Sequence, residues 1–289
     1  MSADQAAVAR ARERLQRRSH AGGRPRRAAV ELLAAPLGLL IVMIGGWYIL
    51  TYEVLETHRR FLLPPLHQIW TRAFADGDVR SELLDGLWVT TKTSMTGLGL
   101  ATALGILFAV LMSQARWIER SFYPWAVLIQ TIPILAIVPL VALWFGVGFW
   151  SRVLVAVMIS LFPIIANTLF GLQSASEEQV DLFEMHGAGR WRRLVKLDFP
   201  AAVPALFTGL RISAGLAVIG TIVGEFFFRS GDRGLGQLIE LHRATNDTAE
   251  MFGAVILSSL LSIAVFTLVG QLGDRLIGNW HEAADDTAA

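Results

Sequence analysis

Several residue types that catalytic and disulfide-rich proteins depend on are scarce in this chain of 289 residues. Cysteine is absent, which excludes a disulfide framework, a thiolate metal site and a cysteine nucleophile. Charged residues make up 17% of the chain, against about 25% in a typical soluble domain. The two lysines, Lys92 and Lys196, do not follow the glycines of a phosphate-binding G-x4-GK[ST] loop, so we expect no nucleotide site here.

Signatures of other catalytic and metal sites are also missing from the sequence. The six histidines are scattered without the spacing of metal ligands. There is no HExxH, no GxSxG and no pair of carboxylates within one apolar run. We therefore expect a chain that is not an enzyme, binds no metal and holds no cofactor of its own.

Apolar sequence, in contrast, is abundant and comes in long runs. Hydrophobic residues make up 54% of the chain, and a bilayer core about 30 Å thick needs roughly 20 apolar residues per spanning helix. Six runs meet this length, at about residues 30–51, 87–112, 123–146, 151–172, 203–228 and 250–273. Lipid offers no hydrogen-bond partners to backbone N–H and C=O groups, so these runs must form helices or barrel strands, and they are too long for barrel strands. We predict an all-α integral membrane protein with six transmembrane helices.

Positive charge gathers ahead of the first apolar run. Eight arginines lie between Arg10 and Arg27, against two acidic residues in the same tail. The positive-inside rule then places both termini in the cytoplasm, and membrane lipid is a better partner for the tail than nucleic acid, because no aromatic residues are interleaved. The predicted organisation is a basic cytoplasmic tail at 1–29, a transmembrane domain at 30–275 and a cytoplasmic tail at 276–289.

Prolines predict where helices are interrupted. Pro64 and Pro65 should end one element, and the residues after them suggest a short helix in the membrane interface. The third run contains Pro133 and Pro139, which predicts a kinked or broken helix. Broken helices at membrane depth usually line a path or a cavity. The second run carries small residues that favour close helix contact, namely Gly97, Gly99 and Gly105.

Polar side chains inside the apolar runs are candidates for a solute path or a gate. Lys92 and Glu225 should lie at similar depth near the outer ends of the second and fifth runs. We hypothesise that they pair or jointly line an outer gate; the alternative is that each extends separately to the membrane surface. Gln130 is another candidate, because it lies close to the Pro133 break. The remaining candidates are Thr90, Thr91, Thr131, Pro133, Asn167, Thr208 and Thr221.

A polar segment at 174–200, which we call the coupling loop, separates the fourth and fifth runs. Its Ser174-x-x-Glu177 spacing fits a capping box and predicts a helix that begins near Ala175. Gly187 and Gly189 should end this helix, because glycine adopts the left-handed conformation easily. A second short helix should lead into the fifth run. From the residues alone, a hairpin on the membrane surface and a loop bound by a soluble partner both remain open.

The coupling loop resembles the cytoplasmic signature of the membrane subunits of type I ABC importers. That signature reads Glu-Ala-Ala, three residues, Gly, nine residues, Ile, one residue, Leu-Pro. This chain has Asp181-Leu182-Phe183, then Gly187 after three residues, then Leu197 after nine, and Phe199-Pro200 after one more. The glycine and the proline match outright, whereas leucine and phenylalanine replace the two alanines.

The resemblance covers about residues 60–275. Pro200-x3-Pro204, Gly209-Leu210-Arg211 and Val223-Gly224-Glu225 are similar to the nitrate/sulfonate/taurine branch of the binding-protein-dependent transport inner-membrane component family. The run 206–216 looks closer to members that handle thiamine-precursor pyrimidines or riboflavin. The sequence itself does not name the solute.

The resemblance implies a permease subunit in the bacterial plasma membrane that forms the path of an ATP-driven importer for a small organic solute. It also implies four partners: an ABC ATPase dimer that binds ATP and Mg, a second permease copy, an extracytoplasmic binding protein or lipoprotein, and membrane lipid. An ion-gradient-driven secondary transporter is the alternative, which only Lys92 and Glu225 favour. The implied ATPase-coupling residues are Asp181, Leu182, Phe183, Glu184, Met185, His186, Gly187, Ala188, Gly189, Arg190 and Pro200.

Overall fold

The computed structural model describes residues 25–228 and 231–285. All regular structure in this part of the chain is helical, without strands. Within these described residues, five helices are long and apolar enough to cross a membrane, and a bent pair of helices raises the number to six if it counts as one span. The predicted all-α membrane fold is confirmed. Its physical reason is that a helix satisfies the backbone N–H and C=O groups of a long apolar run within the run itself. The cytoplasmic position of the termini stays a prediction.

The chain forms two compact units, residues 1–65 and 66–289. In the first unit, α2 (Pro25–Ile49) continues into the π-helical turn η2 (Leu50–Val54) and is followed by the 3-10 turn η3 (Thr57–Leu62). Two side chains join α2 and η2 to the residues after η3: Trp47 Nε1 donates to Pro64 O at 3.0 Å, and Thr51 Oγ1 donates to Leu63 O at 3.1 Å.

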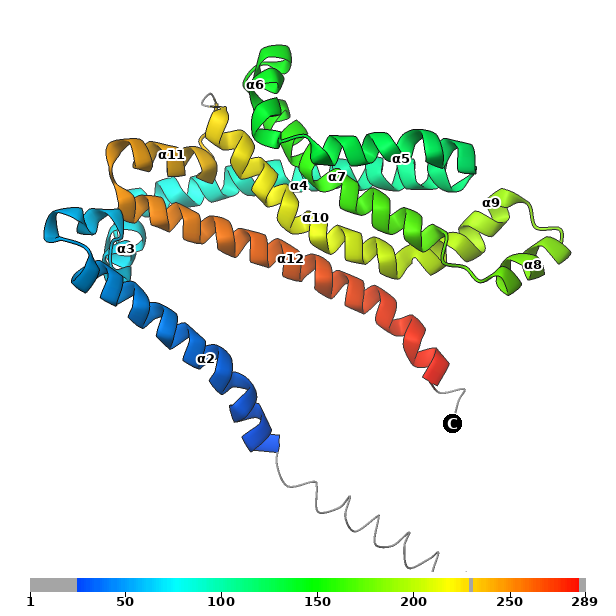
Figure 1. Ribbon diagram of the computed structural model, residues 1–289, viewed down its shortest axis with the longest axis horizontal. Helices are drawn as coiled ribbons and strands as arrows, with labels where there is room; N and C mark the ends of the chain where they lie inside the picture. Colours follow the sequence, from blue (N-terminus) through cyan, green and yellow to red (C-terminus); the bar gives the residue numbers. More distant parts are fainter. Residues whose placement is uncertain (1–24, 229–230, 286–289) are drawn as a thin grey trace, which may run out of the picture. The chain divides into compact units, whose positions relative to one another are not determined.

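The second unit contains the other helices. In chain order they are α3 (Leu66–Ile69), η4 (Trp70–Ala75), α4 (Gly77–Ser113), α5 (Arg116–Thr131), α6 (Ile134–Phe145), α7 (Phe149–Leu172), α8 (Glu177–Met185), α9 (Arg190–Arg193), η5 (Leu194–Asp198), α10 (Phe199–Phe227), α11 (Leu235–Thr245) and α12 (Thr248–Asp285). The long helix α10 packs against α7 and α12, and α7 also packs against α4 (Figure 1). Helices α8 and α9 lie at one end of this bundle and α11 at the other (Figure 1).

Glycines allow the long helices to approach closely. A Cβ on Gly97 would lie 2.6 Å from the Ala156 side chain, and a Cβ on Gly105 would lie 2.6 Å from the Ile164 side chain. Both contacts join α4 to α7, as expected for small residues at helix interfaces in membranes. Gly99 has nothing within 4 Å of a Cβ position, so the prediction of a helix contact there was wrong.

The third apolar run is broken, as its prolines predicted. Helices α5 and α6 meet at an angle of 99°. The break falls at Ile132 and Pro133, where Ile132 has an extended backbone (φ −69°, ψ 127°), because a residue before proline is disfavoured in the helical region. Pro139 lies inside α6 without ending it. Pro65 likewise precedes a short helix, α3, as predicted, which continues into η4.

The helix ends differ from the predicted ones at several points. Helix α2 begins at Pro25 and α12 continues to Asp285, so helix extends into both segments predicted as tails. The boundaries of those tails remain predictions, and residues 1–24 and 286–289 lie outside the described part. Helix is also continuous from Arg190 to Phe227, and Pro200 lies in the first turn of α10, where proline is tolerated. The π-helical turn η5 ends at Asp198, two residues before Pro200, which cannot donate to the helix ladder.

Candidate functional site

The first helix of the coupling loop begins two residues later than predicted. The capping box is formed by Ser176 and Gln179: the Gln179 N–H donates to Ser176 Oγ at 3.4 Å, and the Ser176 N–H donates to Gln179 Oε1 at 3.2 Å. The predicted box at Ser174 and Glu177 is wrong, because the Ser174 hydroxyl donates to Gly171 O at 2.7 Å and completes the end of α7 instead.

The end of α8 is a Schellman motif centred on Gly187. The backbone φ of Gly187 is +65°. The Ala188 N–H donates to Phe183 O at 3.0 Å and the Gly187 N–H donates to Glu184 O at 2.9 Å, which is the hydrogen-bond pattern of this motif. The prediction that Gly187 ends this helix is confirmed. Gly189 was wrongly predicted to be left-handed: its φ is −66° and its ψ is 161°, and it precedes α9 as an N-cap residue.

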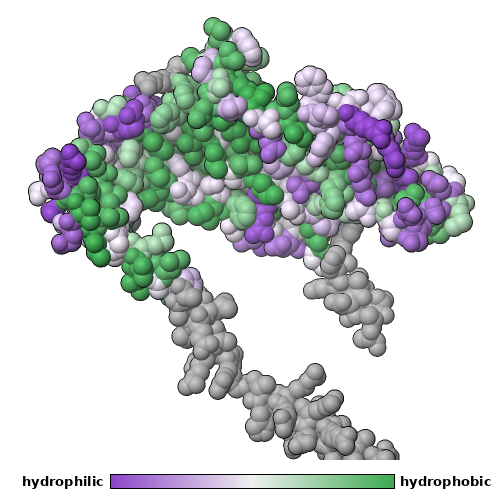
Figure 2. Space-filling model, viewed as in Figure 1, coloured by the Kyte–Doolittle hydropathy of each residue, from purple (hydrophilic) through white to green (hydrophobic). Residues whose placement is uncertain are grey.

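Helix α8 projects from the end of the second unit's helix bundle (Figure 1). Figure 2 shows that the end of the second unit that carries α8 and α9 is largely hydrophilic. Three apolar side chains nevertheless point outward there: Leu182 is 50% exposed, Met185 79% and Trp191 73%. None of the α8 side chains is buried in this chain alone. A short helix with exposed apolar anchors and a polar rim has the composition expected for a helix that docks in a groove of another protein.

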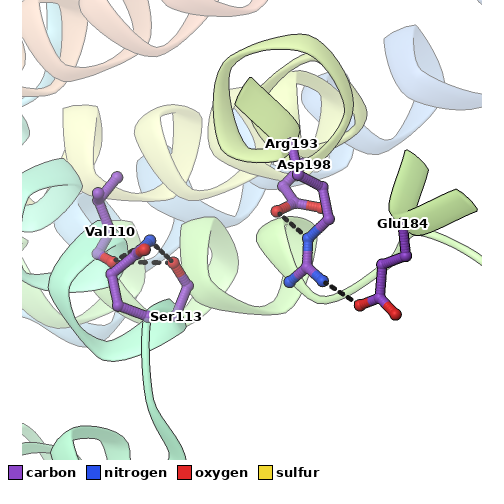
Figure 3. Close-up of polar contacts among 6 residues, drawn as sticks. Val110, Ser113, Glu184, Arg193 and Asp198 are labelled. Carbon is purple, nitrogen blue, oxygen red and sulfur yellow. Dashed lines mark hydrogen bonds and ion pairs between the residues drawn. The ribbon is translucent and has the colours of Figure 1, made fainter. Parts of the chain in front are cut away.

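Arg193 contacts both α8 and the turn at the base of the coupling loop. Its Nε lies 3.2 Å from Asp198 Oδ2, and its Nη1 lies 3.8 Å from Glu184 Oε1 (Figure 3). Asp198 is 8% exposed, whereas the Glu184 side chain is mostly exposed. The arginine therefore bridges the end of α8 to the turn that leads into α10, and the buried Asp198 pair is the better shielded of its two contacts.

Leu194 connects the coupling loop to the core of the bundle. It is 4% exposed and packs in one cluster with Ala109 and Met112 of α4 and with Ile165 and Leu169 of α7. A displacement of the loop would therefore have to move these helices or break the packing, since protein interiors are close-packed.

Next to this contact, a cavity of about 250 Å³ separates the end of α4 from the coupling loop. Its walls include Ser113 and Gln114 at the end of α4, and Glu184, Ala188 and Arg190 from the loop. The base of the coupling loop is therefore not fully packed against α4 in this chain. The adjoining contact between Gln173 Nε2 and Glu119 Oε2, at 3.0 Å, joins the end of α7 to α5.

At the opposite end of the bundle, Glu225 is completely buried and satisfied by hydrogen bonds. Its carboxylate accepts from Thr90 Oγ1 at 2.9 Å and from the Gly236 N–H at 3.0 Å. Thr90 Oγ1 in turn accepts from the Leu235 N–H at 2.8 Å. A Cβ on Gly234 would overlap the same carboxylate. These contacts, which we call the carboxylate cluster, attach the start of α11 to α4 and α10.

Arg152 of α7 completes the carboxylate cluster, and sequence reasoning missed it. Its side chain is 3% exposed, and Nη1 donates to Asp232 O at 2.8 Å. A charged residue within a membrane span is costly unless it is paired, so the presence of Arg152 beside Trp150 and Ser151 at the start of the fourth apolar run could have indicated a partner.

The hypothesised pair of Lys92 and Glu225 does not form. Lys92 is exposed, and its Nζ lies 5.4 Å from the centre of the Phe149 ring, a cation–π contact. The reason is helical phase: Thr90 and Lys92 are two positions apart, so their side chains point about 200° apart around α4. Thr90 faces Glu225, and Lys92 therefore faces away from it.

The other candidate path residues do not meet in one place. Gln130, Thr131 and Pro133 lie exposed at the α5–α6 break. The side chains of Asn167 and Thr208 donate to the carbonyls four residues earlier in their own helices, at 2.8 and 3.1 Å. Such back-bonding is common for polar residues in helices. A role for these five residues in a solute path remains a prediction, and Glu225 is too deeply buried to contact a solute in this conformation.

The comparison with protein families decides the identity of the chain. Residues 101–278 match the family described as "Binding-protein-dependent transport system inner membrane component". The chain belongs to this family. Its members are inner-membrane transport components, so the predicted multi-pass location in the bacterial plasma membrane is confirmed together with the family.

Curated relatives agree with this assignment. The chain is 38% identical over 218 residues to the formylaminopyrimidine transport permease protein ThiX of Halalkalibacterium halodurans, which covers 75% of this chain and 85% of that protein. It is 39% identical over 166 residues to the riboflavin transport system permease protein RibX of Chloroflexus aurantiacus, covering 57% of this chain and 61% of that protein. It is 25% identical to the taurine transport system permease protein TauC of Escherichia coli, covering 85% and 89%.

Solved structures support the fold. A chain of the MetNI methionine ABC transporter in an inward-facing conformation aligns with a TM-score of 0.58 at 18% identity, covering 71% of this chain and 98% of that one. A chain of a bacterial ABC transporter that imports alginate aligns with a TM-score of 0.59 at 13% identity, covering 86% and 96%. The chain is thus a permease subunit of an ABC importer in the nitrate/sulfonate/taurine branch, as predicted. This assignment disfavours an ion-gradient-driven secondary transporter.

Proposed function

We propose that this permease is driven by a separate ABC ATPase dimer, which binds ATP and Mg and grips α8. The observation that carries the proposal is a short helix that projects from the bundle but is fixed at its base. Leu182 and Met185 are exposed on α8, whereas Leu194 is buried among helices α4 and α7. The first two side chains suit a groove in a partner, and the third transmits displacement into the membrane-spanning helices.

The solute, on our proposal, is a small nitrogen heterocycle. Identity to the formylaminopyrimidine and riboflavin permeases is 38% and 39%, against 25% to the taurine permease. A second permease copy completes the path, and an extracytoplasmic binding protein delivers the solute to the end of the bundle that carries α11. The family description, which names binding-protein-dependent transport, supports that last partner.

Site-directed cross-linking tests the coupling proposal, and the chain suits it because it contains no cysteine. Met185→Cys places a thiol on a side chain that is 79% exposed on α8. With a partner ATPase that carries single cysteines across its surface, a bifunctional thiol reagent should join the two chains. Leu84→Cys, which is 51% exposed near the start of α4, is the matched control and should give no product.

Transport measurements complete this test. Solute uptake into proteoliposomes that contain the assembled complex should require ATP on the side of α8. Equal cross-linking from Leu84→Cys and Met185→Cys would contradict the docking of α8. Uptake that follows an ion gradient and ignores ATP would contradict the whole mechanism.

A further inference from the structure

Two hollows adjoin along α5. The first is a cavity of about 200 Å³ between α4, α5 and α7, walled by the rings of Phe108, Phe122, Trp125 and Phe162 and otherwise by aliphatic side chains, methionine and alanine. The second is a cavity of about 530 Å³ at the start of α5, with polar walls. Met112 lines both, so the apolar and the polar hollow are neighbours within the span of a single elongated molecule.

The polar hollow has a net positive lining. Arg116 and Arg120 lie one helical turn apart and therefore on the same face of α5. Both are exposed, and neither forms an ion pair with another described residue. Glu119 also lines this hollow, and its Oε2 accepts a hydrogen bond from Gln173 Nε2 at 3.0 Å. Two guanidinium groups against one carboxylate leave one positive charge for an anionic ligand.

We propose that the two hollows bind one anionic phospholipid, with its phosphate on Arg116 and Arg120 and an acyl chain in the aromatic cavity. Guanidinium groups bind phosphate oxygens in charge-assisted, often bidentate hydrogen bonds. An acyl chain in the aromatic cavity gains dispersion contacts with the rings that line it. The polar-to-apolar order along α5 also matches the order of headgroup and chain in a lipid. The wall from Phe122 to Ile129 is about 10 Å long at 1.5 Å per residue.

The position of the hollows defines the leaflet. They lie beside the α4–α5 connection, and Ser113 lines both the polar hollow and the cavity at the base of the coupling loop. If α8 meets a cytoplasmic ATPase, as the proposed function has it, the lipid belongs to the cytoplasmic leaflet. Only the leaflet depends on that proposed function; the binding itself depends on the residues that line the hollows.

Native mass spectrometry of the purified complex, with added phosphatidylglycerol or phosphatidylcholine of equal chain length, tests the proposal. Phosphatidylglycerol should bind more tightly than phosphatidylcholine. The double variant Arg116→Gln with Arg120→Gln should weaken phosphatidylglycerol binding about 30-fold, or about 2 kcal/mol, from the attraction of each arginine to anionic headgroups. Arg72→Gln with Arg80→Gln, two exposed arginines at the other end of the bundle, removes the same charge and should leave this affinity unchanged.

A second variant tests the acyl-chain cavity. Ala126→Trp fills the aromatic hollow but keeps both arginines, and should weaken binding of phosphatidylglycerol while inorganic phosphate binds no differently. Equal loss of affinity in both arginine pairs would overturn the site, because binding would then follow net charge alone. Two further results would also overturn it: inorganic phosphate binding to the complex as tightly as phosphatidylglycerol, or Ala126→Trp releasing the second permease copy with lipid binding intact. The hollow would be an ion site in the first case and an interface between copies in the second.

Discussion

Gly187 offers the sharpest perturbation of the coupling helix. Its φ of +65° lies in the left-handed region, and a Cβ there would meet nothing within 4 Å. A substitution therefore strains the backbone without a steric clash. The left-handed conformation costs an L-residue other than glycine or asparagine roughly 1–2 kcal/mol, and β-branched residues fit it worst. A penalty of that size lowers the population of the correctly terminated α8 by about 5- to 30-fold.

The assay is solute-stimulated ATP hydrolysis and solute uptake by the permease assembled with its ATPase and binding protein. Gly187→Asn should retain most of both activities, because asparagine tolerates the left-handed conformation. Gly187→Ala should lose a large part, and Gly187→Val the most. All three variants should fold, because the strained residue is exposed and lies outside the helix bundle.

Gly189 is the matched control for this series. It lies two residues further on, also has no atom within 4 Å of a Cβ position, and has an extended backbone that any residue adopts. Gly189→Ser should leave stimulation and uptake unchanged, since serine is a good N-cap residue for α9. Full stimulation and uptake by Gly187→Val would refute the reasoning, as would an equal loss in Gly189→Ser.

Three further predictions concern stability in detergent, measured by thermal unfolding. Leu194→Ala should lower the free energy of unfolding by about 2–5 kcal/mol, whereas Val195→Ala, at a side chain that is 52% exposed, should stay within about 0.5 kcal/mol. Thr90→Val should cost about 1–3 kcal/mol, because it leaves a buried carboxylate and a backbone N–H with one partner fewer. Gly234→Ala should be strongly destabilising because its Cβ overlaps that carboxylate, whereas Gly99→Ala, with open space around it, should be neutral or stabilising by about 0.5–1 kcal/mol. Equal effects of the two glycine variants would contradict the described packing.

The membrane helices could be predicted because features close together in the sequence determine them. Long apolar runs require helix in lipid, and Pro133 lacks the N–H that would continue α5. The start of α8 shows where local reasoning stops. Ser174 and Ser176 are each followed three residues later by glutamate or glutamine, so both fit a capping box. The choice between them is made by a tertiary detail, the bond from Ser174 to the end of α7.

The carboxylate cluster could not be predicted from local patterns. Thr90 and Glu225 are separated by 135 positions, and Arg152 lies 80 positions from the backbone oxygen that it binds. Comparing depths along the chain correctly placed Glu225 near the end of a helix. It selected Lys92 as partner because depth alone ignores rotation around the helix axis. Thr90 lies only two positions from Lys92, but it is the Thr90 hydroxyl that faces Glu225.

The helix that leaves the coupling loop connects the two polar sites. Helix is continuous from Arg190 to Phe227, 38 residues and roughly 55 Å, with Leu194 at one end and Glu225 at the other. Along its length, Gly209 and Gly220 pack directly on the α7 backbone, so we expect the two helices to move together. The irregular place in this rod is the π-helical turn at 194–198. We infer that a displacement of α8 ends at this turn if the turn changes from π-helix to α-helix. If the turn keeps its conformation, the displacement reaches the carboxylate cluster through the packed pair α7 and α10.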